Sequence, residues 1–260
     1  MFQAAPRVMI RNLGLTFSPA TARYAAGDVL QVAGCPVRLK VDGRARRVSL
    51  RLDTTRGEII ATAPSPRRLK EAAAFAAQRA AWIGEALGRL PPAEPLAPGA
   101  LLQVLGRPCR LKAALGPRRQ GLYEEDGLVL RAWGEDDGFR RAALRVLKTE
   151  ALKILAERSA AHAATLGKPA PKVAVMDARS RWGSCTPGGP GRAASLRYSW
   201  RLILAPYEVM DYVAAHECGH LVHADHSPRF WALVAGLGPD VKRSRSWLRA
   251  HGPQLHAVGR

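Results

Sequence analysis

Four of the seven histidines in this 260-residue chain lie within the eleven-residue stretch 216–226. The stretch begins with His216, Glu217 and His220, which together spell the pattern H-E-x-x-H. On a helix, side chains four positions apart lie on one face, one turn from each other. The two imidazoles can therefore bind one tetrahedral Zn²⁺, for which Zn–N distances of about 2.0–2.1 Å are typical.

Glu217 projects beside the two imidazoles, and its side chain is short for a direct bond to the same ion. A carboxylate placed there can take a proton from a water molecule at the ion, which is the task of a general base in zinc-dependent hydrolysis. The neighbouring residues Val209, Met210 and Leu221 are apolar. Imidazoles and a carboxylate are unfavourable on a buried helix unless they are paired or bind a metal, so the apolar frame favours a metal site over a polar surface helix.

A catalytic zinc usually has three protein ligands and one open position. His223 lies seven residues after His216, roughly 10 Å along an α-helix, so three side chains of one helix cannot converge on one ion. His226 is the better third ligand, because the serine and proline that follow it are a good N-cap and first residue for another helix. We therefore expect His216, His220 and His226 as zinc ligands, with the fourth position left to water.

The charge of the chain leaves two interpretations open. Lysine and arginine number 40 against 21 acidic residues, which gives a formal net charge of +19. A charge of this size favours an anionic partner such as a nucleotide or a nucleic acid. The alternative is compositional, because the positive charge is dispersed arginine in an alanine-rich chain without a basic tail.

Composition also bears on location. No run of 18 apolar residues occurs, so we expect no transmembrane helix and no membrane partner. The first 33 residues lack an uninterrupted apolar segment of the kind found in signal peptides. The four cysteines, which are Cys35, Cys109, Cys185 and Cys218, are far apart and form no CxxC pair. This usage is typical of reduced thiols, and we expect a cytoplasmic protein.

The elements that must position the site follow from apolar periodicity. Residues 1–33 carry little pattern and are expected to form a poorly ordered extension. Residues 34–135 are expected to form a β-rich N-terminal part with one long helix at about 67–90. Strands are expected near 37–41, 48–52, 59–61 and, after a proline-rich linker at 91–98, between 101 and 132.

Residues 136–252 are expected to form the core that carries the histidines. The patterns predict a helix at about 137–166, a strand at 172–176, a hairpin that ends near 200 and a short extended stretch at 201–204. The histidine helix is expected to start at Pro206, and two further helices at about 229–237 and 242–250. Residues 253–260 are expected to be a tail.

Several motifs occur in order from residue 180 onward. They are Ser180-Arg181-Trp182-Gly183-Ser184-Cys185, Tyr198-Ser199-Trp200-Arg201-Leu202, Ala205-Pro206, H-E-x-x-H, His226-Ser227-Pro228-Arg229-Phe230-Trp231 and Trp247-Leu248. In this combination the chain resembles the YgjP-like metallopeptidase domains, which are related to the SprT and WLM families. The resemblance covers about residues 36–252. It implies zinc at the three histidines, Glu217 as catalytic base, and an α+β fold with a small zincin-like core behind the β-rich part.

Two features of this stretch depart from expectation. Gly219 inside a helix costs up to about 1 kcal/mol relative to alanine, so it either admits a close neighbour or is simply tolerated. Metzincins are similar in the spacing from His220 to His226, but they carry glycine where His223 stands here. No methionine follows Met210, so a Met-turn is absent and the chain is not a metzincin proper.

Three residues outside the histidine stretch are candidates for substrate binding or for stabilising an oxyanion. Arg181 and Trp182 could form a wall of the cleft, with an edge strand that pairs with an extended substrate. In the alternative interpretation, Trp182 belongs to the core and Arg181 forms a structural ion pair. Tyr198 is a third candidate, although a tyrosine on a strand usually serves packing. Cys185 and Cys218 could be further metal ligands, but a closed four-ligand site would be structural.

These observations favour a zinc-dependent hydrolase that acts on a peptide or protein substrate, with Glu217 as general base. A nucleoside-triphosphate pyrophosphatase that uses the same metal site is a second hypothesis, since some YgjP-like proteins are linked to that activity. A basic nucleic-acid-binding module with a vestigial zinc site is a third. Glu217 argues against the third hypothesis, because a structural zinc site needs no general base.

Overall fold

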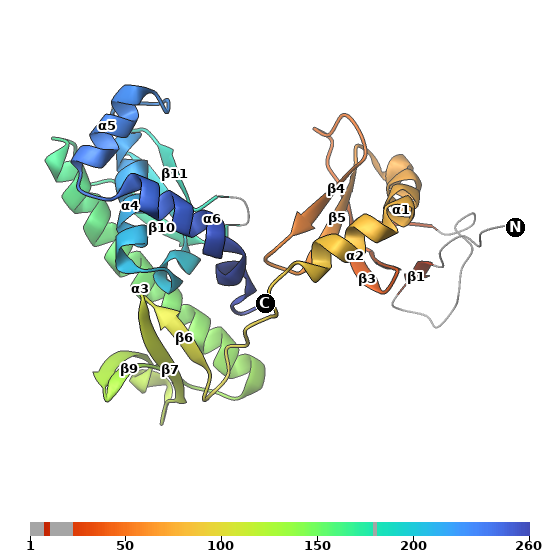
Figure 1. Cartoon of the computed structure of the whole chain (residues 1–260), viewed down its shortest axis with the longest axis horizontal. Coiled ribbons are helices and arrows are strands. Elements are labelled where there is room, and N and C mark those ends of the chain that lie inside the picture. Colours follow the sequence, from red (N-terminus) through yellow and green to blue (C-terminus); the bar gives the residue numbers. More distant parts are fainter. Residues whose placement is uncertain (1–7, 11–22, 179–180) are drawn as a thin grey trace, which may run out of the picture. The chain divides into compact units, whose positions relative to one another are not determined.

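The computed structural model describes residues 8–10, 23–178 and 181–260. The chain separates into two compact units, residues 1–92 with residue 260, and residues 93–259. Each unit has its own hydrophobic core. The fold is mixed α and β, with a β-rich N-terminal region (Figure 1). The domain boundaries expected from the sequence stay a prediction.

The first unit is built on a five-stranded sheet in the order β1-β2-β3-β5-β4. Its strands are β1 (Val8–Ile10), β2 (Val29–Val32), β3 (Cys35–Val41), β4 (Ser49–Asp53) and β5 (Glu58–Ala63). β3 and β5 run parallel, and the other neighbours are antiparallel. Strands β1 and β2 lie inside the range 1–33, and the rest of that expected extension is largely outside the described residues.

Helices cover this sheet and complete its core. After the 3₁₀ turn η1 (Pro66–Arg68), two helices follow, α1 (Leu69–Gln78) and α2 (Ala80–Gly88). The single helix expected at 67–90 is therefore wrong, because Arg79 leaves the helical conformation at φ −105° and ψ 22°. The segment Gln78-Arg79-Ala80 has high helix propensity, so local preference does not explain the break.

The second unit begins with a sheet whose topology repeats that of the first. Its order is β6-β7-β9-β8, which matches β2-β3-β5-β4, and the strand pair β7–β9 is parallel as β3–β5 is. The strands are β6 (Leu101–Val104), β7 (Arg107–Ala113), β8 (Gly121–Glu125) and β9 (Gly127–Ala132), with the 3₁₀ turn η2 (Pro117–Arg119).

The repeat extends to the sequence of the first hairpin in each unit. Residues 27–41 read GDVLQVAGCPVRLKV, and residues 99–113 read GALLQVLGRPCRLKA. Both hairpins turn through two left-handed residues, Ala33-Gly34 and Leu105-Gly106, with φ between 50° and 77°. Such two-residue turns match the twist of the flanking strands, so one sequence pattern specifies the same hairpin twice.

A 30-residue helix, α3 (Asp136–Thr165), runs through the second unit and contacts both of its sheets (Figure 1). The second sheet has the order β10-β12-β11, with β10 (Lys172–Met176), β11 (Gly183–Thr186) and β12 (Ser195–Ser199). β11 and β12 form the expected antiparallel hairpin, and β11 is an edge strand of this sheet.

The remaining elements surround the site. They are the 3₁₀ helix η3 (Trp200–Leu204), α4 (Tyr207–Gly219), α5 (Pro228–Gly236) and α6 (Val241–Ala257). The extended stretch expected at 201–204 is wrong, because all five residues of η3 are buried and the segment curls into the core. The expected tail is also helical, since α6 continues through Pro253 and buries Leu255 and Ala257.

Among the described residues, no helix combines the length and the apolar character needed to cross a membrane.

Candidate metal centre

Helix α4 carries His216 and Glu217 in its last turn. The helix is buried along most of its length, and it packs against α3, α5, α6, η3 and strand β11. Its residues Val209, Met210 and Val213 belong to the core of the second unit. The site side chains are therefore held by a helix that has neighbours on several sides, which limits their movement.

The structure brings the three expected histidines together. One ring nitrogen from each of His216, His220 and His226 lies within 4.8 Å of the others. The Nε2 atoms of His216 and His226 are 3.2 Å apart, close to the separation of about 3.3 Å that tetrahedral ligands at Zn–N distances near 2.05 Å would have. Within the described part of the chain, no other group of three His, Cys, Asp or Glu side chains converges in this way.

His223 contributes to this group through its backbone. Its carbonyl oxygen lies 2.9 Å from Nδ1 of His220 and accepts a hydrogen bond when that nitrogen is protonated. This arrangement leaves Nε2 of His220 unprotonated and free to bind a metal. Nδ1 of His216 is buried without such an acceptor among the described residues, so only His220 is oriented in this manner.

His226 lies in the loop between α4 and α5, as the sequence predicted. The loop ends where the Ser227 hydroxyl accepts a hydrogen bond from the backbone nitrogen of Phe230, with Pro228 at the start of the helix. The Asp225 side chain accepts a further bond from the backbone of Ser227 at 3.3 Å. These local bonds define the turn that returns the chain toward the end of α4.

The first turn of α5 supplies an aromatic wall for the three imidazoles. The ring centroid of Phe230 lies 5.0, 4.6 and 4.9 Å from those of His216, His220 and His226. Trp231 lies 5.6 Å from His216 and 5.5 Å from His226. Aromatic side chains of this size restrict the ring rotations of the histidines and keep water from one side of the group.

Burial keeps His216 neutral. It lowers the pKa of this residue to about 4, and the nearby His220, His226 and Arg245 add to the effect. A neutral imidazole is the form that binds a metal ion, because a protonated ring has no free lone pair. The environment of His216 therefore favours metal binding at neutral pH.

Glu217 lies beside the imidazoles and is only 5 % exposed. Burial raises the pKa of its carboxyl to about 7, although Arg181 acts in the opposite direction. Strand β11 passes directly over this side chain at Gly183, where a Cβ atom would lie 2.4 Å from Oε1 of Glu217. Only glycine allows the strand to approach the carboxylate so closely.

Gly219 of α4 likewise allows a neighbouring element to approach closely. A Cβ atom at this position would lie 2.9 Å from both Phe230 and Val234 of α5. The glycine therefore lets α5 pack closely against α4. Of the two alternatives left by the sequence, Gly219 admits a close neighbour and is not simply tolerated. The close approach also sets Phe230 against the three imidazoles.

A cavity of about 380 Å³ opens beside His216 and Glu217. Arg181, Trp182 and Gly183 form part of its lining, next to the end of strand β11. The other lining residues are Tyr212, Val213, Arg245, Leu248 and Arg249. The structure thus places Arg181 and Trp182 in one lining with His216, and Trp182 also packs against the core of the second unit; their role in binding a substrate stays a prediction.

Tyr198 and the two cysteines near α4 are placed differently. Tyr198 is fully buried, and its hydroxyl pairs with the hydroxyl of Ser159 at 2.9 Å instead of lining the cavity. Burial raises the pKa of Cys185 to about 11 and that of Cys218 to about 12. These thiols stay protonated, and neither cysteine belongs to the converging metal-ligand group found in the described residues.

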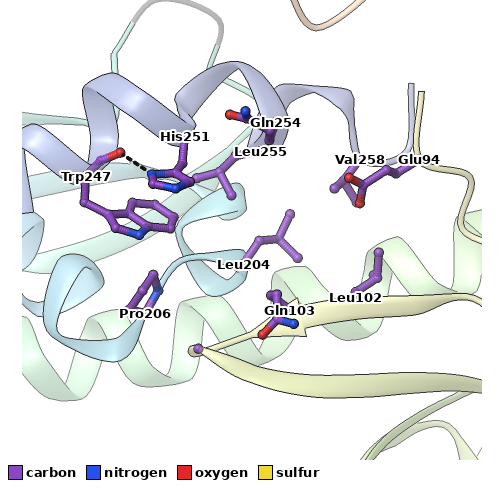
Figure 2. A pocket seen from close by; sticks show the side chains of 11 residues that line it. Glu94, Leu102, Gln103, Leu204, Pro206, Trp247, His251, Gln254, Leu255 and Val258 are labelled. Carbon is purple, nitrogen blue, oxygen red and sulfur yellow. Dashed lines mark hydrogen bonds between the residues drawn. The ribbon is translucent and has the colours of Figure 1, made fainter. Parts of the chain in front are cut away.

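A second cavity, of about 340 Å³, is bordered by other residues of α6, among them Trp247, His251 and Leu255 (Figure 2). It is lined mainly by apolar side chains of α6, η3 and the β6–β7 hairpin. The Trp247 and His251 rings stack there at 4.5 Å, and Nδ1 of His251 donates to the Trp247 carbonyl at 3.0 Å. No converging set of metal-binding or nucleophilic groups lines this cavity, so we assign the chemistry to the cavity at α4.

Sequence reasoning missed several residues of the site. Gly183, Phe230 and Trp231 were noted as parts of motifs without a role, and Arg245 and Arg249 were not singled out. The aromatic pair could have been found from its position directly after the N-cap of α5. Nothing local in the sequence places Arg245 beside residues of α4, because α6 reaches the site only in the folded chain.

The comparison with protein families agrees with this site. The model of the YgjP-like metallopeptidase domain matches residues 46–251, and the chain belongs to this family. Membership identifies it as a hydrolase of the metallopeptidase type. Searches of curated proteins and of solved structures give no significant match.

Proposed function

We propose that the chain is a zinc-dependent peptidase in which His216, His220 and His226 hold the metal and Glu217 is the general base. One observation carries the proposal, namely the convergence of three ring nitrogens next to a buried carboxylate at an open cavity. The donor set fits zinc, because three imidazoles with an open fourth position are characteristic of catalytic zinc sites. Family membership supports a peptidase.

When bound, zinc would supply Lewis acidity, which polarises a carbonyl oxygen and lowers the pKa of a water molecule. Glu217 would accept a proton from the attacking water and return it to the nitrogen of the leaving amine. A group that accepts and then donates a proton works best when its pKa lies near the working pH. Burial raises the pKa of Glu217 to about 7 without metal, and the positive charge of a bound zinc ion would lower it and favour the carboxylate form that accepts the proton.

In this proposal, strand β11 is the platform to which the substrate binds. It is an edge strand of its sheet, it lines the cavity at Gly183, and it contacts α4. An extended peptide can add to such an edge through backbone hydrogen bonds. We propose that β10–β12, α4 and the returning loop at His226 form a zincin-like core of this kind.

The test is a Glu217→Gln variant assayed for peptide hydrolysis and for zinc content. Glutamine has nearly the same shape but cannot accept the proton, so turnover should fall about 10²–10⁴-fold. Zinc content should remain at the wild-type level, because the ligands are unchanged. Wild-type turnover in this variant would remove Glu217 from the role of base, and loss of zinc would make it a ligand.

A matched pair of histidine variants tests the ligand assignment in the same preparation. His226→Ala should lose zinc, because one of the three converging nitrogens is removed. His223→Ala should keep it, because only the backbone carbonyl of His223 contacts the group. Zinc content measured by elemental analysis separates the two, and full occupancy in His226→Ala would contradict the assignment.

Hydrolysis of a nucleoside triphosphate at the same metal remains a second candidate function. The observation that favours it is the presence of three arginines in the lining of the cavity. The comparisons give no support to a nucleic-acid-binding module.

A further inference from the structure

Between Arg245 of α6 and the three imidazoles lies one aromatic ring, that of Trp231. The guanidinium carbon of Arg245 lies 4.7 Å from the ring centroid of Trp231, which in turn lies 5.5 Å from His226. Stacking on an indole holds a guanidinium in place while its N–H groups stay free to bind another partner. Arg245 is therefore a positioned cation beside the three imidazoles.

Two more arginines line the same cavity. Arg249 lies one helical turn after Arg245, on the same face of α6. Arg181 lies next to Gly183, and its charge lowers the pKa of Glu217. The lining thus contains three guanidinium groups, and Glu217 is its single carboxylate among the described residues.

Some arginines of the second unit form ion pairs, whereas others, such as Arg110 and Arg197, form none among the described residues. Arg158 pairs with Asp211 at 2.7 Å, and Arg201 pairs with Asp177. Exposed arginines also find partners, as Arg107 does with Glu124. Among the described residues, no ion pair is formed by Arg181, Arg245 or Arg249, and helix α6 contains no acidic residue at all.

A surplus of arginine on a basic chain would by itself mean little. The basic residues of α6 are not spread evenly, because Lys242 and Arg243 line a different cavity together with Asp240. This argues against a surplus of arginine that reflects composition alone. Of the described residues that line the cavity with Arg245 and Arg249, the one acid is Glu217, which the proposed reaction requires as a base. The cavity therefore has a positive potential that a negatively charged ligand can neutralise.

We propose that Arg245 and Arg249 form a subsite that selects peptides with a carboxylate close to the scissile bond. This proposal rests on the peptidase function proposed above. Arginine binds a carboxylate through two parallel N–H bonds, which fix its orientation as well as its charge. The carboxylate belongs to an aspartate or glutamate side chain or to a free C-terminus, and Arg181 adds to the same field from the opposite wall.

The first experiment compares cleavage of paired fluorogenic peptides that differ only in glutamate against glutamine at each position within three residues of the scissile bond. Wild-type enzyme should prefer the glutamate peptide by about 10- to 100-fold in kcat/KM, as expected for one charge-assisted contact. Arg245→Gln and Arg249→Gln should each lower the ratio of kcat/KM for the glutamate peptide to kcat/KM for the glutamine peptide toward one. Arg243→Gln is the matched control on the same helix and should keep the preference.

A binding measurement keeps the test independent of turnover. Fluorescence anisotropy with the Glu217→Gln protein should show tighter binding of the glutamate peptide, and Arg245→Gln in that background should abolish the difference. Peptides with a free or an amidated C-terminus distinguish a terminal carboxylate from a side-chain carboxylate. If peptides with a free C-terminus bind more tightly than amidated ones, whether they carry glutamate or glutamine, the subsite recognises the chain terminus.

The outcomes separate this inference from the proposed function. Equal kcat/KM for glutamate and glutamine peptides, together with equal kcat/KM for peptides with a free and an amidated C-terminus, would overturn the subsite and leave the peptidase standing. Preference that survives both arginine variants would also overturn it. Hydrolysis of nucleoside triphosphates that depends on Arg245, without cleavage or binding of any peptide, would overturn both proposals.

Discussion

Glu217 lies beneath a strand position that admits no side chain. Strand β11 approaches it at Gly183, where a Cβ atom would come within 2.4 Å of Oε1 and 2.6 Å of Cγ. The atoms in the way belong to the glutamate side chain and not to a backbone, so the clash can be relieved by moving the carboxylate. The consequence should appear in catalysis more than in stability.

Gly183→Ala is therefore expected to lower kcat by about 10²-fold, since a misplacement of roughly 1 Å has effects of that size. Zinc content should not change, because the histidines are not displaced, and the melting temperature should fall only slightly. Gly189→Ala is the control, as a Cβ atom at this position of the same hairpin meets nothing within 4 Å. A Gly183→Ala enzyme with normal kcat would show that the carboxylate tolerates the shift.

Gly219 shows the same principle at a helix–helix contact. Its missing Cβ admits Phe230 and Val234 of α5, and Phe230 is the ring that packs on all three imidazoles. The helix propensity that glycine forgoes is about 1 kcal/mol. That loss is offset by the close packing of two helices around the metal centre.

At the scale of elements, α4 is attached to α3 by a buried polar cluster. Oδ1 of Asp211 accepts hydrogen bonds from Nε of Arg158 and from Nε2 of His162, both at 2.7 Å. Burial by itself would raise the pKa of Asp211, but the bonds from His162 and Arg158 outweigh burial and lower it. The cluster holds the middle of α4 in place, five residues before His216.

Asp211→Asn is expected to reduce the free energy of unfolding by about 1–3 kcal/mol at pH 7, because the charged acceptor of a largely buried pair is lost. Since the pKa of Asp211 is lowered in the fold, this stabilisation is present above its unfolded pKa of about 3.9 and is lost as the pH falls through the folded value. Urea denaturation of both metal-free proteins between pH 7 and pH 2.5 measures the difference.

The difference in the free energy of unfolding between the wild type and Asp211→Asn should disappear as the pH falls below about 4. Besides Arg158 and His162 on α3, the ionisable group that senses Asp211 is the Cys218 thiol on α4, whose raised pKa keeps it neutral throughout this range. A difference that stays constant down to pH 2.5 would mean that the carboxylate charge contributes nothing to the cluster.

The two units of the molecule have separate cores, and both contain the same hairpin and the same order of four strands, β2-β3-β5-β4 and β6-β7-β9-β8. All the residues of the metal centre and its cavity belong to residues 93–259. A unit with its own core is expected to fold without the rest of the chain. The chemistry of the site should therefore be separable from the first unit.

A fragment of residues 93–259 is expected to fold cooperatively and to bind one zinc ion. Circular dichroism during thermal unfolding and elemental analysis of the purified fragment check this. A fragment with the additional change His216→Ala should fold equally well but lack the metal. An unfolded fragment, or a folded one without zinc, would show that residues 1–92 are needed to complete the centre.

Local patterns in the sequence were sufficient to predict those parts of the site that depend on local geometry. The spacing of His216 and His220 is one helical turn, and the serine and proline after His226 start the next helix. Both features act within a few residues, so periodicity and capping were enough to predict them. The β11–β12 hairpin and the strand β10 followed from the same kind of local pattern.

Contacts between segments far apart in the chain could not be predicted in this way. The approach of Gly183 to Glu217, the bond from Arg158 to Asp211 and the arrival of Arg245 at Trp231 each join two separate elements. No local pattern encodes such contacts, because they depend on how whole helices and sheets pack. The burial of η3 and the continuation of α6 past Pro253 have the same cause, since the core of the second unit encloses both segments.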